Sequence, residues 1–366
     1  MCLTSCQRFD VMGVSDPNFP TSSQTLAAIY LRMSDQQKLE IEKSRSLDDW
    51  YGVENLTSKG WEYSELRNQG HKVREDLKLS YKWRRGLGDS ELEKVNMSGQ
   101  SRDVTLLKYS LATFLFERAG FKMPKLSVFN LFINDVWQGP YLNLELVDGD
   151  FLRFNSMPEG TLFKAQYRAE LTLKNDVKMS QAFAQKYPDP VESDLKSLLR
   201  LEELAKILDV GIVDDTLEFS RIFDVENAIR YLAVSKLIQN SDGIKNNYYL
   251  YLNSQTNKFE FIPWDLDETF RGANVEGIYV NNFFEQLEVR ADFGQRISER
   301  MIEIWDEELV NEELGRLNDS IGVYAAAQEQ YYLNSHVEHK TSVESIQKFI
   351  QNVTLGLSKS KSFVKK

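Results

Sequence analysis

Cysteine, histidine and long apolar runs are all scarce in this sequence. The 366 residues include two cysteines, Cys2 and Cys6, and three histidines, His71, His336 and His339. Two cysteines this close to one end cannot form a framework of cross-links, and so few histidines argue against a His-based zinc site. No run of about 20 apolar residues occurs, so the sequence predicts no transmembrane helix.

An excess of basic residues is also missing. The chain carries 55 acidic and 44 basic side chains, which gives a formal net charge of −11. Because no basic stripe is present to neutralise phosphates, the sequence argues against a nucleic-acid partner. The length and the hydrophobic content of 42% are those of a globular protein with a substantial core and two subdomains.

The first residues raise a separate question about a lipid anchor. Residues 3–6, Leu-Thr-Ser-Cys, resemble a bacterial lipoprotein cleavage box, in which Cys6 becomes the lipidated N-terminus. A signal peptide needs roughly 7–15 apolar residues before the cleavage site, and five residues cannot supply them. Either the start is truncated or the match is chance, so an anchor through Cys6 stays open.

Three regions of the chain differ in pattern and predict an α+β protein. Residues 1–25 are polar and are expected to form a flexible tail, whereas residues 26–175 are rich in short strand-like segments. Residues 176–366 are mostly helical, apart from one hairpin. Within this scheme we expect a helix capped by Asp103 and stopped by Gly120, a hairpin turn at residues 134–135, a loop at 241–245 and one helix over 291–310.

The hairpin of the C-terminal half concentrates polar side chains at its ends. Two β-rich runs, 246–253 and 258–265, are joined by a polar turn, and a turn centred on Thr256 would place Asn247 opposite Asp265. Asp265 directly follows the apolar residues Ile-Pro-Trp, where a lone carboxylate is costly. Two oxygen ligands at a sheet end suit Mg²⁺, which takes one or two protein groups together with phosphate oxygens.

Three further residues near this hairpin have both a functional and a structural interpretation. Asp242 lies five positions before Asn247, the D-x-x-x-x-N spacing of a kinase catalytic loop, yet Asp before Gly is also a common turn pair. Asp267 is either another metal ligand or a cap for the next segment of the chain. Trp264 is either a nucleotide contact or part of the core.

Several segments together resemble the spore-coat CotH family of atypical, kinase-like proteins. The strings "NSDGIKNNYYLY" and "FIPWDLDETF" carry the most specific part of the resemblance. Upstream, "LRNQGHKVREDLKLSYKW", "SRDVTLLKYSLATFLFERAG", "LFINDVWQGPYLNLELVDGDFL" and "GTLFKA" are similar to further family segments. The resemblance runs from about residue 27 to 275. The lone G-x-G at 86–88 assigns no phosphate loop.

The resemblance implies a two-lobed protein-kinase-like fold with a β-rich, nucleotide-binding N-terminal lobe and a mostly helical C-terminal lobe. It implies transfer of the γ-phosphoryl group of ATP to Ser or Thr of a protein, with Mg²⁺ or Mn²⁺ bound. Asp242 would be the catalytic acid, Asn247 and Asp265 would hold metal, and Lys164 would contact phosphate, oriented by Glu145. Positioning and charge neutralisation would supply most of the catalysis.

Two other classes of function remain open on the sequence. Residues 265–267 also form a D-x-D motif of the kind found in metal-dependent glycosyltransferases, although this leaves Asp242 and Asn247 unexplained. A kinase-shaped scaffold or coat protein without catalysis is the third candidate. The family resemblance favours an extracytoplasmic, cell-surface or spore-coat location, while a cytoplasmic one is not excluded, and the protein substrate is not identified.

Overall fold

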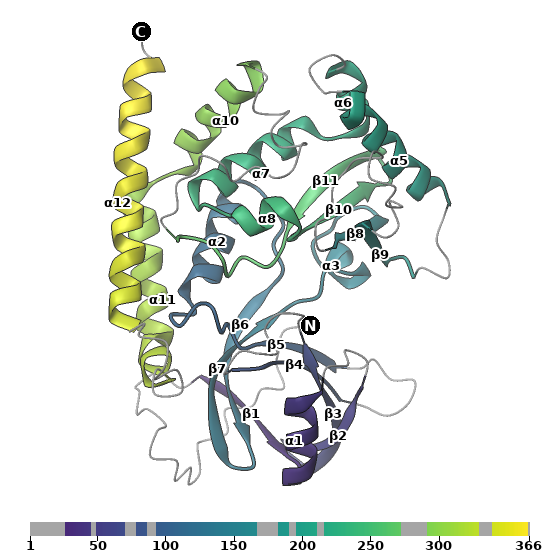
Figure 1. The fold of residues 1–366 in the computed structure, drawn as a ribbon, viewed down its shortest axis with the longest axis vertical. Coiled ribbons are helices and arrows are strands. Elements are labelled where there is room, and N and C mark those ends of the chain that lie inside the picture. The colour runs from purple at the N-terminus through teal and green to yellow at the C-terminus, as the bar shows by residue number, and fades with distance from the viewer. Residues whose placement is uncertain are drawn as a thin grey trace. The chain divides into compact units, whose positions relative to one another are not determined.

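The structure, a computed structural model, describes residues 26–44, 49–69, 78–85, 93–166, 182–189, 195–210, 216–271, 291–328 and 339–364. The predicted tail, with Cys6, lies outside the described residues. Figure 1 labels the helices and strands, which are β1 Ala27–Arg32, α1 Asp35–Lys43, β2 Tyr51–Thr57, β3 Gly60–Gln69, β4 Ser80–Arg85, β5 Glu93–Ser98, α2 Leu107–Arg118, β6 Leu126–Ile133, β7 Val136–Leu144, α3 Gly149–Phe154, β8 Gly160–Ala165, β9 Phe183–Tyr187, α5 Leu195–Val210, α6 Thr216–Ile222, α7 Val225–Leu237, α8 Ser241–Lys245, β10 Tyr248–Asn253, β11 Lys258–Pro263, α10 Ala291–Ile304, α11 Glu307–Ala327 and α12 His339–Val364.

The chain forms two compact units that interleave along the sequence. The first, called the barrel unit, comprises Met1–Leu107, Lys125–Leu146 and Leu314–Ser345. The second, called the sheet unit, comprises Lys108–Pro124, Val147–Glu313 and Ile346–Lys366. The sequence predicts two consecutive domains, 26–175 and 176–366. Helix α3 and strand β8 lie in the first of these predicted domains, yet in the structure they belong to the sheet unit.

The barrel unit corrects the expectation of a protein-kinase-like N-terminal lobe. Its seven strands close into a barrel in the order β1-β2-β3-β4-β5-β7-β6. Closure depends on β1 pairing with β6 in parallel, from Ala27 opposite Phe129 to Leu31 opposite Ile133. Because this pairing joins segments about 100 residues apart, no local pattern in the sequence announces it.

The inside of the barrel follows from the alternation of side chains along its strands. Leu66, Trp83, Val95 and Leu131 belong to one buried apolar cluster, and the residues between them on the strands point outward. The predicted hairpin turn between β6 and β7 is confirmed. Both turn residues, at 134 and 135, have positive φ (52° and 63°), the conformation that Asn and Asp tolerate best among non-glycine residues.

A lysine is buried in the barrel unit without a carboxylate partner among the described residues. Lys78 is 6% exposed, and its ammonium donates to the carbonyl of Pro140 and to Gln328 Oε1, the latter at 2.7 Å. The ammonium also lies 4.4 Å from the centre of the Tyr141 ring. Burial lowers the pKa of Lys78 well below its usual value, because the charged form loses its hydration.

Replacing Lys78 with methionine is expected to flatten the dependence of stability on pH. The unfolded lysine keeps its proton up to about pH 10.5, whereas the folded one releases it earlier, so folding becomes more favourable as pH rises through this window. The slope is at most about 1.4 kcal/mol per pH unit. Urea unfolding of the wild type and Lys78→Met at several pH values between 7 and 10 measures it. Equal slopes in both proteins, or the same flattening in Lys94→Met on the exposed surface, would contradict the assignment.

The sheet unit is built on four antiparallel strands in the order β11-β10-β8-β9. Helix α7 lies along this sheet beside β11 (Figure 1), and the Asn227 side chain joins the two by bonding both backbone groups of Phe261. The Tyr231 and Phe261 rings stack with their centres 4.6 Å apart, and Tyr248 packs edge-on against Phe261 at 5.2 Å. This aromatic core fixes the end of α7 against the hairpin.

The helices confirm several sequence predictions and correct others. Helix α2 begins at Leu107, later than the predicted cap, and the Asp103 carboxylate accepts hydrogen bonds from Thr105 instead. The predicted stop at Gly120 is confirmed, since its φ is +85°. The single helix expected over 291–310 is wrong: α10 ends at Ile304, and Asp306 caps a new helix, α11. No helix in the described ranges is long and apolar enough to cross a membrane.

Candidate functional site

The end of helix α7 leads into the segment that carries Asp242. The loop expected at 241–245 is wrong, because Ser241–Lys245 forms the short helix α8. Asn247 Nδ2 donates to Asp242 Oδ2 at 2.7 Å, so the structure brings together the two ends of the D-x-x-x-x-N spacing. Asn246 Nδ2 in turn donates to Asn247 Oδ1 at 3.0 Å, which fixes how the Asn247 amide is oriented.

Asn240 and Tyr231, which the sequence did not single out, hold this short helix in place. Asn240 Oδ1 accepts from the Gly243 backbone N–H at 3.0 Å, and the Tyr231 hydroxyl donates to the Gly243 carbonyl at 3.0 Å. The Asn240 side chain is 1% exposed. An Asn two positions before an acid at a helix end is a capping pattern, and this signal could have identified it.

Gly243→Ala is expected to disturb the segment that carries Asp242 strongly. A Cβ at Gly243 would lie 2.1 Å from Asn240 Nδ2, closer than any real contact, so Asn240 and α8 must move. We expect a loss of about 1–3 kcal/mol in the free energy of unfolding, which thermal unfolding measures.

Gly315→Ala is the matched control for that substitution. A Cβ at Gly315 meets nothing within 4 Å, and the residue lies inside helix α11. The control should raise the free energy of unfolding by about 0.5–1 kcal/mol. If Gly243→Ala behaves like Gly315→Ala, α8 is not held as described.

The segment after strand β11 carries Asp265 in an unusual backbone conformation. Its φ is +58°, in the left-handed region that few non-glycine residues occupy. The segment is held behind it, because the Thr269 hydroxyl donates to the Leu266 carbonyl at 2.8 Å and the Phe270 N–H donates to the Ile238 carbonyl at 2.8 Å. The Asp265 segment is therefore tied to the end of α7, just before the helix that carries Asp242.

Lys164 lies on β8, which is separated from β11 by β10, and is close enough to Asp265 for their charges to interact. Its ammonium lies 5.3 Å from the centre of the Trp264 ring and 5.8 Å from that of Tyr249, the cross-strand partner of Lys164. Burial lowers the pKa of Lys164, the nearby Asp265 charge acts against that lowering, and Lys186 adds to it. The Lys164 ammonium and the Asp265 carboxylate interact electrostatically beside two aromatic rings, and together they form the charged centre of the candidate site.

Trp264 lies next to this lysine and packs against Tyr249. The residue is 6% exposed, and its ring meets Tyr249 edge-on with centres 5.7 Å apart. The burial of the ring fits the core interpretation that the sequence offered. The nucleotide contact stays a prediction.

Two further acids, Asp267 and Asp148, lie near the same centre, as their effects on the pKa of two buried tyrosines indicate. Burial raises the pKa of Tyr109 on helix α2 well above its usual value, and Asp265 and Asp267 act in the same direction. Burial also raises the pKa of Tyr249, with Asp148 and Asp265 adding to it. Asp267 therefore lies near the same phenol as Asp265, and Asp148, at the start of α3, is an acid that the sequence missed.

The sequence predicted a register for the hairpin and a partner for Lys164, and the two predictions have different outcomes. The predicted register of the hairpin is wrong by one residue, since Tyr248 pairs with Pro263 and Asn247 therefore does not face Asp265. The loop at 254–257 has four residues, so its centre falls between two residues rather than on Thr256. Glu145 lies in the barrel unit, where its carboxylate accepts from the Lys125 N–H at 2.8 Å. Its pairing with Lys164 stays a prediction.

The donors suit a small hard cation. Asp265, Asp267 and Asn247 offer carboxylate and amide oxygens, the ligands that Mg²⁺ and Mn²⁺ prefer. Among the described residues, no three His, Cys, Asp or Glu side chains gather as a metal cluster. A nucleotide-bound Mg²⁺ does not require such a cluster, because it uses one or two protein groups, phosphate oxygens and water.

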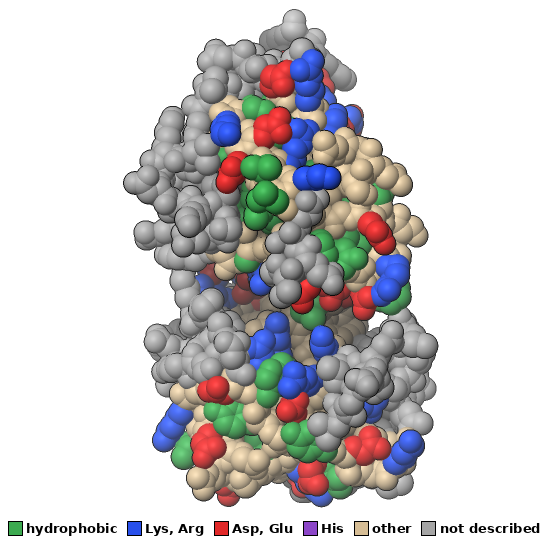
Figure 2. Space-filling model, turned by 90° about the vertical axis from the view of Figure 1, so that its right-hand side faces the viewer, with side chains coloured by type: hydrophobic (Ala, Val, Ile, Leu, Met, Phe, Trp, Pro, Cys, Tyr) green, Lys and Arg blue, Asp and Glu red, His purple; other side chains and the backbone are tan. Residues whose placement is uncertain are grey.

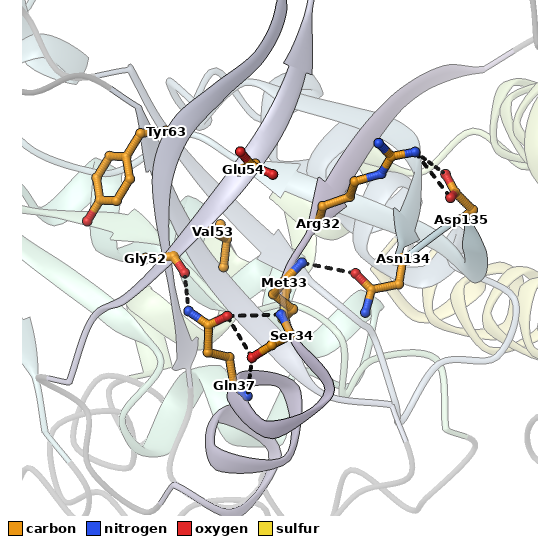
Figure 3. A pocket seen from close by; sticks show the side chains of 10 residues that line it. All are labelled: Arg32, Met33, Ser34, Gln37, Gly52, Val53, Glu54, Tyr63, Asn134 and Asp135. Carbon is orange, nitrogen blue, oxygen red and sulfur yellow. Dashed lines mark hydrogen bonds and ion pairs between the residues drawn. The ribbon is translucent and has the colours of Figure 1, made fainter.

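A hollow of about 590 Å³ in the barrel unit contains none of the predicted site residues (Figure 3). Its polar side chains already bond one another: Gln37 bonds Ser34 and the Gly52 carbonyl, and Arg32 pairs with Asp135 at 3.3 Å. Much of the lining thus completes the cap of α1 and the β6–β7 turn. It is not the candidate site.

A family model and a curated relative point to one family. A family model described as CotH kinase protein matches residues 66–354. The inner spore coat protein H of Bacillus subtilis (strain 168) is 27% identical over 189 residues, which cover 50% of this chain and 51% of that protein. The match thus spans about half the length of this relative. A crystal structure of the Helicobacter pylori proinflammatory kinase CtkA is similar over 85% of this chain and 95% of that one, with 8% identity and a TM-score of 0.33.

Proposed function

This chain belongs to the CotH kinase protein family, and from that premise we propose that it is a metal-dependent protein kinase. It transfers the γ-phosphoryl group of ATP to a Ser or Thr hydroxyl of a protein. The observation that carries the proposal is the hydrogen bond between Asn247 and Asp242, just before the first strand of the hairpin. Asp265 follows the second strand of the same hairpin and lies near Lys164.

The roles follow from the chemistry of the side chains. Asp242 orients the substrate hydroxyl and receives its proton as the hydroxyl oxygen bonds to the γ-phosphorus and the bond from that phosphorus to the β–γ bridging oxygen breaks. ADP then leaves with the bridging oxygen. The hydrogen bond from Asn247 fixes one carboxylate oxygen of Asp242.

Asp265, Asp267 and Asn247 would hold the Mg²⁺ or Mn²⁺ ion, which neutralises charge on the triphosphate when it is bound. The Lys164 ammonium supplies a further positive charge to a phosphate oxygen, and Glu145 is proposed to orient it. Burial lowers the pKa of Lys164 and Asp265 opposes that lowering, so the carboxylate proposed to hold the metal also favours the charged form of the lysine.

The location of the protein is proposed from its relative. The curated protein it matches is an inner spore coat protein, so we propose association with a coat or another surface layer. A lipid anchor through Cys6 is part of this proposal, and it concerns residues outside those that the structure describes.

Incubation of the purified chain with γ-³²P-labelled ATP and Mn²⁺ or Mg²⁺ tests the proposal. We expect label on Ser or Thr of the chain itself or of an added acceptor protein, and none when the metal is chelated. We also expect ATP with metal to raise the melting temperature. Failure of ATP to bind, or label arriving only from a sugar nucleotide, would overturn the assignment.

A further inference from the structure

A second lysine lies close to Lys164 on the four-stranded sheet of the sheet unit. Strand β9 pairs with β8, and Ala184 of β9 lies directly opposite Lys164. Lys186 follows two positions later, so its Cα is about 7 Å along β9 from the point opposite Lys164. A lysine stem of four carbons covers that distance easily, so the two ammonium groups can reach the same bound group.

Lys186 is the extra residue of a β-bulge. Phe163 pairs with Gln185 and Leu162 pairs with Tyr187, so Lys186 has no residue of β8 opposite it. Bulges are frequent next to functional sites, where they turn a side chain in a new direction. The direction here is toward Lys164, because the charge of Lys186 adds to the lowering of the pKa of Lys164 that burial causes.

The residues on either side of Lys186 are anchored, whereas Lys186 is not. The Tyr187 ring occupies the space in which a side chain at Gly149 would lie, since a Cβ there would be 2.4 Å from Tyr187 Cε2. Gln185 Nε2 donates to the Pro188 carbonyl at 3.1 Å. Lys186 is exposed and makes no hydrogen bond or ion pair with another described residue. The strand thus holds the backbone of Lys186 firmly and leaves its ammonium available.

Two neighbouring ammonium groups repel each other, which makes this placement unfavourable in the empty protein. The Asp265 carboxylate acts on Lys164 in the opposite direction and offsets part of the repulsion. An anion bound between the two lysines would reverse its sign, because each ammonium is a compact point charge with three donors. Phosphate oxygens accept such charge-assisted hydrogen bonds well.

The surroundings favour a compact anion over a long polyanion. The upper part of Figure 2, where the sheet unit lies, shows basic and acidic side chains interspersed on the face that it draws. The chain as a whole carries a net charge of −11. Nucleic acid requires an extended basic surface, whereas a short phosphate chain requires only a few cations in one place.

We propose that Lys186 is a second phosphate-binding residue, which together with Lys164 holds the phosphate chain of a nucleoside triphosphate. The inference rests on the proposed function, since it adds a contact to the same nucleotide. Lys164, Lys186 and Asp265 all belong to the sheet unit, so the contact needs no residue of the barrel unit. Two point charges at different positions would neutralise different phosphate oxygens as charge shifts during transfer.

Calorimetric binding of ATP and of adenosine, each with Mg²⁺, tests the role of Lys186. Lys186→Met keeps the apolar stem and removes the charge, so it should weaken ATP binding about tenfold and leave adenosine binding within twofold. Inorganic tripolyphosphate should compete with ATP on the wild type and much less on Lys186→Met. Lys186→Arg keeps the charge and should bind ATP within about threefold of the wild type.

Lys206→Met is the charge-matched control. Lys206 is exposed on helix α5 of the same unit, and its substitution should leave the affinity for ATP unchanged. Without ligand, the melting temperature of Lys186→Met should stay level or rise, because the repulsion of Lys164 is gone. A lower melting temperature together with an equal loss of ATP and adenosine binding would mean that Lys186 is structural and would overturn the inference.

The position of β9 offers a simpler role that the same experiment excludes or confirms. β9 is an edge strand, and an exposed lysine on an edge can serve only to prevent pairing with another chain. In that case Lys186→Met would bind ATP like the wild type, and the inference alone would be overturned. If the wild type binds no ATP, with or without metal, the proposed function itself is overturned.

Discussion

Asp265→Asn is expected to lower the rate of phosphoryl transfer about a thousandfold while the chain stays folded. Asparagine tolerates the left-handed conformation at this position, where φ is +58°, so the substitution removes the charge without straining the backbone. The loss has two physical sources. One oxygen ligand for the metal becomes neutral, and Lys164 loses the opposite charge that favours its protonated form.

Initial rates with radiolabelled ATP and the metal-dependent rise in melting temperature measure this effect together. We expect both to disappear in Asp265→Asn. Asp150→Asn, on the exposed surface of helix α3 in the same unit, is the control and should retain both. Transfer within tenfold of the wild type in Asp265→Asn would remove this residue from the site.

Asp242→Asn is expected to produce a loss of similar size with a different signature. The asparagine cannot accept the substrate proton, so the maximal rate should fall about a hundred- to ten-thousandfold. The KM for ATP should stay within about twofold, because Asp242 acts on the hydroxyl rather than on the nucleotide. Steady-state kinetics against ATP, with the acceptor protein saturating, separates the two parameters.

The contrast between the two variants is the sharper test. Asp265→Asn should lose metal-dependent ATP binding, whereas Asp242→Asn should keep it and lose only the chemical step. If Asp242→Asn raises the KM for ATP as strongly as it lowers the maximal rate, its carboxylate belongs to the nucleotide site and its assignment as the proton acceptor is wrong.

Local chemistry explains what the sequence could predict. The stop of α2 at Gly120 and the turn at 134–135 each depend on a few neighbouring residues, and both form. The candidate residues Asp242, Asn247 and Asp265 were found in the same way, from short spacings around one hairpin.

The features that escaped prediction depend on distant partners or on small differences in loop geometry. The barrel closes through the pairing of β1 with β6, which no local pattern contains. The hairpin register shifted by one residue because its loop has an even number of residues. The positions of Lys164 and Tyr109 around Asp265 emerge only when β8, β10 and α2 pack together.

The hydrogen bond from the Phe270 N–H to the Ile238 carbonyl joins the two ends of the stretch that carries Asp242 and Asp265. The chain leaves α7, carries Asp242, passes through the hairpin, carries Asp265 and returns to its starting point. A stretch whose two ends are joined keeps its internal geometry when the sequence outside it drifts. A substitution on the surface outside this stretch should therefore leave the arrangement of Asp242 and Asp265 in place.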